Sequence, residues 1–277
     1  MRLGGPLFEQ CPDPESWVKA HQRAQYRAAF CPLPPDADDA TVKAYADAAA
    51  AADLVIAEVG AWSNPLGPDE AASKAALEHC KRSLDLADRI GARCCVNIAG
   101  SRGEKWDGPC AEDLTEETFD LIVEMMRDII DTVKPTRSYY TLETMPWMIP
   151  DSADSYVAVL NAVDRKAFAV HFDPVNLINS PQRYFNTKGV IDEFVAKLGP
   201  HIRSCHGKDI ALRDRLTTHL DEVQPGLGGL DYGAFLQAVA ALPEDTPIML
   251  EHLTIEEEYV EAANYVRSVA KAEGLTL

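Results

Sequence analysis

One pattern recurs along this chain: a short apolar run, a polar loop and then an amphipathic helix. The apolar runs, which we expect to be strands, are 2–7, 28–32, 54–60, 93–99, 138–144, 168–173, 202–208 and 247–252. The expected helices are 14–25, 38–52, 69–90, 115–133, 152–165, 187–198, 231–241 and 255–273. Strands that alternate with helices form parallel βαβ units, and eight such units in about 250 residues fit a closed barrel better than an open sheet. We therefore predict an α/β fold, a (β/α)8 TIM barrel.

The composition restricts the partners. Hydrophobic residues make up 47% of the chain and charged residues 25%, as in a soluble globular protein. The net charge of −18 repels phosphate backbones and anionic lipid, so we expect no nucleic-acid or membrane partner. No low-complexity linker divides the sequence, and we expect a single domain over residues 1–277. The sequence leaves open whether the protein is a homo-oligomer.

The cysteines and the beginning of the chain indicate the compartment. The seven cysteines include no C-x-x-C pair, so we interpret them as reduced thiols, several of them small apolar fillers in strands. The first residues lack a charged-then-apolar signal pattern, and no apolar run approaches about 18 residues. We expect a cytoplasmic protein.

Each of the last four apolar runs carries an ionisable side chain at or near its end. The residues are Glu143, Asp173, His206 and Glu251, separated by 30, 33 and 45 positions. In a barrel of this class, chemistry takes place where the carboxyl ends of the strands meet. Three carboxylates and one imidazole suit one divalent ion such as Mn²⁺, Mg²⁺ or Co²⁺, with Zn²⁺ as a further alternative.

Each of these residues also has an ordinary interpretation as a helix cap, a salt-bridge partner or a packed histidine. For a single strand end, that interpretation is favoured. Four in order on strands five to eight favour a shared metal site, because inward-facing strand ends of a barrel meet.

The sequence around these residues resembles the sugar phosphate isomerase/epimerase superfamily, the xylose-isomerase-like barrels that include tagatose/psicose 3-epimerases and inosose dehydratases. The resemblance covers nearly the whole chain and is strongest in TLETMPW, HFDPVN, SCHGKDI, PGLGGLDY and MLEH. It implies that Glu143, Asp173, His206 and Glu251 bind one Mn²⁺-type ion. It also implies that Glu143 and Glu251 are catalytic and exchange a proton with a carbon next to a carbonyl.

The resemblance therefore implies a metal-dependent sugar isomerase or epimerase that works through an enediolate. The alternative is a lyase or dehydratase that acts on a keto-sugar, a keto-inositol or a 3-oxo-glycoside with the same residues. Two further interpretations are weaker: the net charge opposes an apurinic endonuclease, and the intact quartet opposes an inactive scaffold.

Several further residues are candidates for substrate contact. His171 and Lys208 lie two positions from Asp173 and His206, and alternate residues of a strand share a face. For His171 the alternative is a packed core histidine, and for Lys208 it is a salt bridge to a carboxylate. The other candidates, from the ends of strands and the loops after them, are Glu58, Trp62, Trp106, Trp147 and Asn176.

One of these positions and a glycine-rich loop bear on the identity of the substrate. Asn176 stands where the ketose 3-epimerases of this superfamily usually carry a histidine, which argues against the usual ketohexose. The glycine-rich loop at 225–229 either cradles a phosphate or makes tight turns before a helix, and the second interpretation is favoured.

Overall fold

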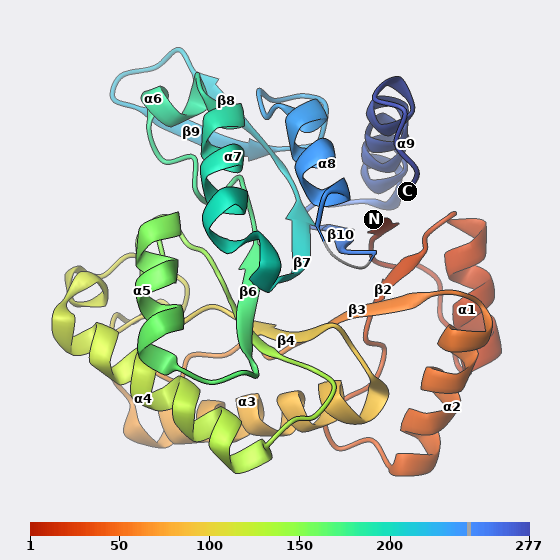
Figure 1. Ribbon diagram of the computed structural model, residues 1–277, viewed down its shortest axis with the longest axis horizontal. Helices are drawn as coiled ribbons and strands as arrows, with labels where there is room; N and C mark the ends of the chain where they lie inside the picture. The colour runs from red at the N-terminus through yellow and green to blue at the C-terminus, as the bar shows by residue number, and fades with distance from the viewer. Residues whose placement is uncertain (243–244) are drawn as a thin grey trace. The chain divides into compact units, whose positions relative to one another are not determined.

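Eight parallel strands form a closed barrel in the computed structural model, which describes residues 1–242 and 245–277 (Figure 1). Around the barrel the order is β1-β10-β7-β6-β5-β4-β3-β2. The barrel strands are β1 (Arg2–Gly4), β2 (Ala28–Phe30), β3 (Val55–Gly60), β4 (Cys94–Asn97), β5 (Tyr140–Glu143), β6 (Phe168–Phe172), β7 (Ile202–Gly207) and β10 (Pro247–Leu250). Each lies inside one of the eight predicted runs, and the predicted (β/α)8 barrel is confirmed.

The predicted helices are also present, with ends that agree within two residues. They are α1 (Pro14–Arg23), α2 (Asp39–Ala51), α3 (Glu70–Ile90), α4 (Glu116–Val133), α5 (Ala153–Val163), α7 (Thr187–Leu198), α8 (Tyr232–Ala240) and α9 (Glu256–Ala272). Thr115 caps α4, since its hydroxyl accepts the N–H of Thr118 at 3.2 Å. Gly91 ends α3 with φ 79°, a left-handed conformation that glycine adopts without strain.

The chain divides into two compact units. One comprises residues 1–29, 48–55 and 172–277, and the other comprises residues 30–47 and 56–171. We call them the terminal unit and the middle unit and describe each by itself. The expectation of a single domain stays a prediction.

In the terminal unit, strand register determines which side chains emerge together. On β10 and β7, Met249 lies opposite His206 and Leu250 lies opposite Gly207. The next residues of the two strands, Glu251 and Lys208, therefore leave the sheet at the same level. Helix α7 covers β6 through Phe194, whose ring stacks on Phe172 with centroids 4.5 Å apart.

In the middle unit, β5 lies between β4 and β6. Glu143, the last residue of β5, lies opposite His171 of β6. Helices α3, α4 and α5 lie side by side along these strands (Figure 1). Helix α4 buries an apolar face that includes Ile122, Met126 and Ile129, which fixes it against the sheet.

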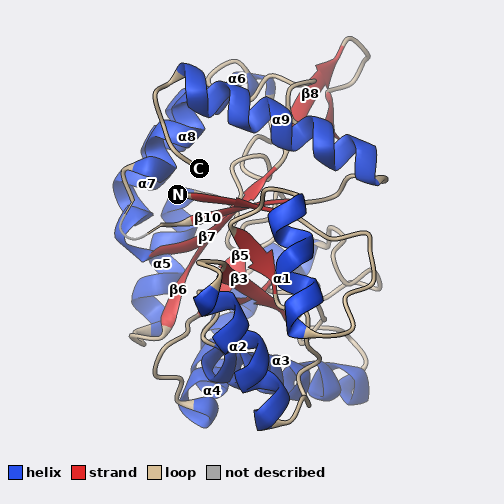
Figure 2. Cartoon of the chain, turned by 90° about the vertical axis from the view of Figure 1, so that its right-hand side faces the viewer, coloured by secondary structure: helices blue, strands red, loops and turns tan. Residues whose placement is uncertain are grey.

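The structure adds elements that the sequence pattern did not predict. Strands β8 (Asp209–Arg213) and β9 (His219–Val223) form an antiparallel hairpin directly after β7 (Figure 2). Three short turns complete the chain: η1 (Ala111–Leu114), α6 (Pro181–Tyr184) and η2 (Gly199–His201). The hairpin lies in the stretch that we expected to be a loop after the seventh barrel strand.

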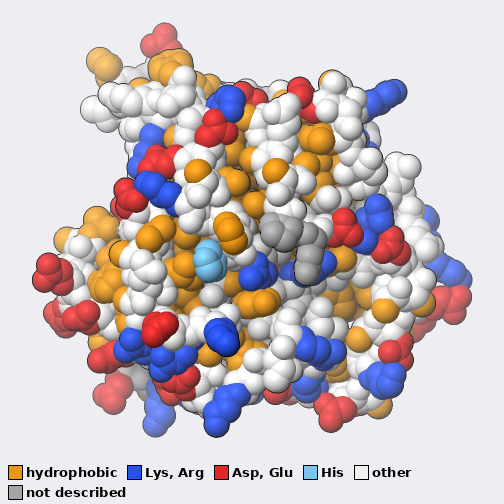
Figure 3. Space-filling model, in the orientation of Figure 1, with side chains coloured by type: hydrophobic (Ala, Val, Ile, Leu, Met, Phe, Trp, Pro, Cys, Tyr) orange, Lys and Arg blue, Asp and Glu red, His pale blue; other side chains and the backbone are white. Residues whose placement is uncertain are grey.

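Charged side chains of both signs lie on the surface. On the face shown in Figure 3, Lys and Arg side chains are interspersed with Asp and Glu side chains.

None of the helices among the described residues combines the length and the apolar character needed to span a bilayer.

Candidate active site

A cluster of charged side chains lies at the ends of β6, β7 and β10 in the terminal unit. Lys208 is 2% exposed, and its Nζ lies 2.7 Å from Asp173 Oδ2 and 2.8 Å from Glu251 Oε1. His206 Nδ1 lies 2.8 Å from the same Glu251 oxygen and 3.8 Å from Asp173 Oδ2. Three side chains of the predicted quartet are thus in direct contact, with a buried ammonium group among them.

Asp173 is oriented by its own backbone. The N–H groups of Val175 and Asn176 donate to Asp173 Oδ1 at 2.9 and 3.2 Å. An aspartate that accepts the N–H two residues later makes an Asx turn, which fixes the carboxylate. Oδ1 therefore accepts hydrogen bonds within the Asx turn, and Oδ2 faces Lys208 and His206.

The donor atoms fit a divalent cation. The side chains of Asp173, His206 and Glu251, all in the terminal unit, each offer one ligand atom, and these atoms lie within 4.8 Å of one another. Glu143, in the middle unit, stays a predicted fourth ligand. Carboxylate oxygen and imidazole nitrogen together suit ions of the Mg²⁺ and Mn²⁺ type. This buried cluster could hold a metal ion, and the identity of the ion stays a prediction.

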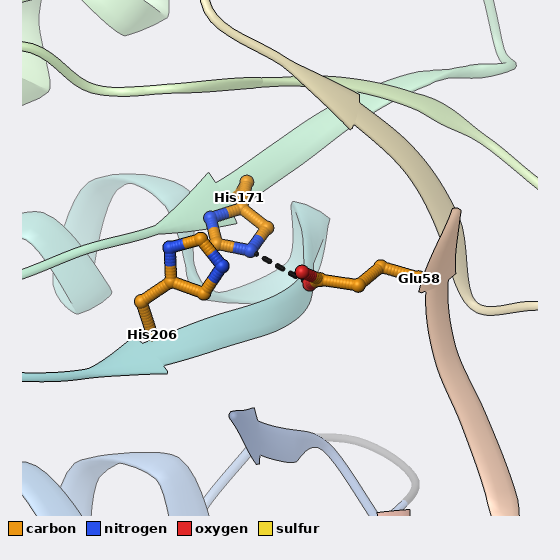
Figure 4. Close-up of side chains that lie close together, drawn as sticks. All are labelled: Glu58, His171 and His206. Atoms are coloured by element: carbon orange, nitrogen blue, oxygen red, sulfur yellow. Dashed lines mark hydrogen bonds and ion pairs between the residues drawn. The ribbon is translucent and has the colours of Figure 1, made fainter. Parts of the chain in front are cut away.

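Glu58 and His171 form a buried pair in the middle unit. His171 Nε2 lies 3.0 Å from Glu58 Oε2, and the two side chains are at most 1% exposed (Figure 4). Glu58 lies inside β3, two residues before its last residue Gly60, whereas we expected it at the strand end. A carboxylate bonded to one ring nitrogen orients a histidine. Substrate contact by either residue stays a prediction.

A buried tyrosine from α5 bridges the backbones of β5 and β6. The Tyr156 hydroxyl lies 2.7 Å from the Leu142 carbonyl oxygen and 2.9 Å from that of Ala169. Burial raises the pKa of Tyr156 well above its usual range, so the hydroxyl stays protonated. Leu142 precedes Glu143, and the sequence pattern did not identify this support because it depends on a contact from α5.

The three candidate tryptophans are partly exposed: Trp62 is 42% exposed, Trp106 38% and Trp147 37%. The indole N–H of Trp147 donates to the Asp107 carbonyl oxygen at 3.0 Å. This bond ties the loop after β5 to the loop after β4. Exposed aromatic faces suit the C–H faces of a sugar, and such contact stays a prediction for all three residues.

Asp209 organises the glycine-rich loop. Its carboxylate accepts the backbone N–H groups of Gly226, Gly228 and Leu230 at 2.9, 3.0 and 2.9 Å. A Cβ at position 228 would lie 2.3 Å from Asp209 Oδ1, so only glycine fits there. The N–H groups that could cradle a phosphate thus bind a carboxylate of the protein, which favours the tight-turn interpretation.

The hairpin brings Glu222 to the cluster, a residue that the sequence analysis did not single out. Glu222 Oε2 lies 3.7 Å from Lys208 Nζ, and Glu222 Oε1 lies 3.1 Å from His252 Nδ1. Nothing in the sequence around His252 or Glu222 indicates that the two residues pair. Only the antiparallel pairing of β8 and β9 places Glu222 near β7 and β10.

Comparisons with known proteins agree with this fold. The sequence profile of a family described as xylose isomerase-like TIM barrel matches residues 19–269. No curated protein sequence matches the chain.

Among solved structures, D-psicose 3-epimerase with D-tagatose from Clostridium cellulolyticum H10 is 15% identical, with a TM-score of 0.69 and 100% of each chain covered. A xylose isomerase-like TIM barrel protein from Mycobacterium smegmatis in complex with magnesium is 17% identical, with a TM-score of 0.66, 95% of this chain and 90% of that chain covered. The probable 3-DHS dehydratase of Bacillus anthracis is 17% identical, with a TM-score of 0.67 and 95% of each chain covered. At these identities the likeness shows the fold alone.

Proposed function

Because the chain belongs to the xylose isomerase-like TIM barrel family, we propose that it is a divalent-metal-dependent isomerase or epimerase of a keto-sugar or sugar derivative. The observation that carries the proposal is the contact among Asp173, His206 and Glu251, three side chains from three different strands. Isolated caps or surface salt bridges do not bring buried ionisable groups from separate strand ends to one point. Such clustering is typical of catalytic sites.

The residues have distinct roles in this proposal. Glu143, Asp173, His206 and Glu251 hold the cation, for which we propose Mn²⁺. When bound, a divalent cation supplies Lewis-acid stabilisation of the charge that develops on the substrate oxygens. Glu143 and Glu251 are the two carboxylates that take and return the proton on the carbon next to the carbonyl.

Lys208 keeps two of these carboxylates in place. Its ammonium group lies between Asp173 and Glu251, so it orients both oxygens and compensates part of their charge. A group positioned this way is also suited to stabilise an oxyanion, because it is desolvated and already fixed.

A dehydratase or lyase is the second candidate. Asn176 contacts Asp173 through its backbone, and it replaces the histidine that the resemblance leads us to expect in ketose 3-epimerases. One of the similar structures is a probable 3-DHS dehydratase. Proton removal by the same glutamates starts both reactions, and they differ in whether a leaving group on the next carbon departs.

Proton exchange with solvent tests both candidates at once. The purified protein with Mn²⁺ is incubated in D₂O with D-psicose, D-tagatose, D-fructose and a 3-keto-glucoside, and each mixture is followed by ¹H NMR. We expect deuterium at a carbon next to the carbonyl of at least one compound. A new sugar supports the isomerase or epimerase, and an unsaturated product supports the lyase. No exchange with any keto-sugar would contradict the proposal.

Glu143→Gln is the matched variant. It removes the base and one ligand charge but keeps the size of a side chain that is 5% exposed. We expect the rate of exchange to fall by at least about 10³-fold, while the far-UV circular dichroism spectrum stays that of the wild type. Exchange at the wild-type rate would exclude Glu143 from the mechanism.

A further inference from the structure

A histidine beyond Glu251 is held by the hairpin. His252 Nδ1 lies 3.1 and 3.2 Å from the two carboxylate oxygens of Glu222, which reaches it from β9. His252 Nε2 lies 3.7 Å from Glu251 Oε1, beyond hydrogen-bond range. The ring is thus oriented through one nitrogen, and its other nitrogen is directed to the side where Glu251 lies.

The backbone of His252 is in a costly conformation. Its φ is 61°, in the left-handed region that non-glycine residues rarely occupy. Such a conformation is strained, and residues of this kind concentrate at functional sites. Its side chain is 58% exposed, so burial of the ring does not compensate for the strain.

The hairpin that carries Glu222 is firmly attached to the terminal unit. Asp209, the first residue of β8, is 1% exposed and binds three backbone N–H groups of the glycine-rich loop. On β9, Glu222 lies opposite Ile210 and Asp221 lies opposite Ala211. The two acidic side chains are adjacent in the strand and therefore lie on opposite faces of the hairpin. Asp221 pairs with Arg213 at 2.9 Å on the face that Glu222 does not use.

We propose that His252, positioned by Glu222, determines substrate specificity through a hydrogen bond that its Nε2 accepts from a hydroxyl of an unphosphorylated sugar. This inference rests on the proposed function. His252 follows Glu251, a proposed proton-transfer residue, and its Nε2 lies 3.7 Å from Glu251 Oε1, so the ring stands beside the proposed reacting group. Glu222 is a positioning residue, because it acts through the imidazole.

The charges around the ring favour a neutral ligand. Glu222, Glu251 and Asp173 supply three carboxylates, and the buried Lys208 already contacts the last two. The glycine-rich loop uses its N–H groups on Asp209. A phosphate placed here would meet carboxylates, whereas a hydroxyl can donate to the Nε2 of a neutral imidazole whose Nδ1–H is directed to Glu222.

The test compares variants on the sugar that the wild type converts fastest in the panel above. His252→Asn removes the ring but keeps a residue that tolerates φ near 60°. Glu222→Gln removes the charge that orients the ring. We expect KM to rise roughly tenfold in each variant, with kcat within about threefold of the wild type, as for loss of one hydrogen bond to substrate. Asp221→Asn, on the other face of β9, is the control and leaves KM unchanged.

Monodeoxy analogues of the same sugar locate the partner hydroxyl. For one analogue, wild type and His252→Asn should have the same KM, because the bond is absent from both complexes. Mn²⁺ affinity, measured by isothermal titration, should be the same in His252→Asn and wild type.

Three results would overturn the inference: unchanged KM in both variants, a KM effect that persists with every deoxy analogue, or a sugar phosphate converted more efficiently than the neutral sugar. If the wild type itself converts no sugar of the panel, the proposed function fails, and with it the premise. If the wild type converts a sugar and the variants do not differ from it, only the role of His252 fails.

Discussion

Lys208 is the residue on which the electrostatics of the site depend. An ammonium group that is 2% exposed can stay charged only beside anions, and Asp173 and Glu251 lie within 2.8 Å of it. The same two oxygens belong to the proposed metal ligands. Lys208 and the proposed metal ion thus share Asp173 and Glu251 as binding partners. The positive charge of the lysine should therefore weaken the attraction of these carboxylates for the metal ion.

Lys208→Met tests this sharing. The methionine side chain has a similar length and no charge, so the variant leaves the carboxylates without their internal cation. We expect the metal-free variant to lose about 3 kcal/mol of unfolding free energy, because buried charges become uncompensated. We expect its Mn²⁺ affinity to rise at least about tenfold, because one positive charge near the ion is removed. Urea unfolding and isothermal titration measure the two effects, and equal or weaker Mn²⁺ binding would contradict the account.

At the scale of elements, Tyr156 joins α5 to strands β5 and β6. The side chain is fully buried, and its hydroxyl contacts the backbone of Leu142 and Ala169. Tyr156→Phe keeps the ring and leaves buried backbone groups without this partner. We expect a loss of about 1–3 kcal/mol in the free energy of unfolding. Urea denaturation measures the loss, and a variant as stable as the wild type would show that the hydroxyl is not needed.

Asp88 on α3 fixes the turn between α4 and β5. Its Oδ1 accepts the backbone N–H groups of Thr136, Arg137 and Ser138 at 2.7, 2.6 and 2.9 Å. Partial burial raises the pKa of Asp88, but the three N–H donors outweigh it, so the pKa is lower than that of a free aspartate. The ionised form is therefore favoured by folding.

The stability of the protein should follow this shift. A carboxyl group whose pKa is lowered in the folded state stabilises the protein fully above its unfolded pKa of about 3.9, and the effect is lost as pH falls through the folded pKa. We expect Asp88→Asn to cost about 1–2 kcal/mol at pH 7 and progressively less below about pH 4. Urea unfolding between pH 7 and pH 3 measures the difference. Asp85→Asn, on the same helix, is the control, and an equal cost in both variants at pH 7 would contradict the role of Asp88.

The hairpin shows where sequence patterns fail at this scale. Strand β9 has the sequence HLDEV, in which two adjacent acidic residues separate the apolar residues Leu220 and Val223. Period-two alternation is too short to detect there, and the stretch is polar enough to pass for a loop. Glu222 and the role of Asp209 therefore emerge only from the pairing of β8 with β9.

At the scale of the whole molecule, the sequence determined the architecture well because eight βα cycles repeat one physical pattern. Each barrel strand is a short buried run, and each helix carries an apolar stripe, so both are visible without tertiary information. The grouping of Asp173, His206 and Glu251 could be anticipated because the strand ends of a parallel barrel meet, and their role as ligands together with Glu143 stays a prediction. A salt bridge of Lys208 to a carboxylate is one of the two interpretations from the sequence, but the sequence does not identify its partners. The contacts of Tyr156 and His252 could not be predicted, since they depend on how side chains from separate elements pack.

Metal binding is the property on which the proposed function depends. A ligand that binds only the folded state raises its stability, so a bound ion should raise the melting temperature in proportion to the logarithm of its concentration. The acidic chain also attracts cations non-specifically, and a measurement must separate a specific site from that background.

Equilibrium dialysis against Mn²⁺ at about 0.15 M salt makes that separation, because surface charges are screened at this ionic strength. Wild type, Asp173→Asn and the surface control Asp221→Asn are compared, with bound manganese counted by elemental analysis. The account predicts one tightly bound ion per chain in wild type and control, and an affinity at least about tenfold weaker in Asp173→Asn. Equal binding by all three proteins, or no tight site in the wild type, would contradict it.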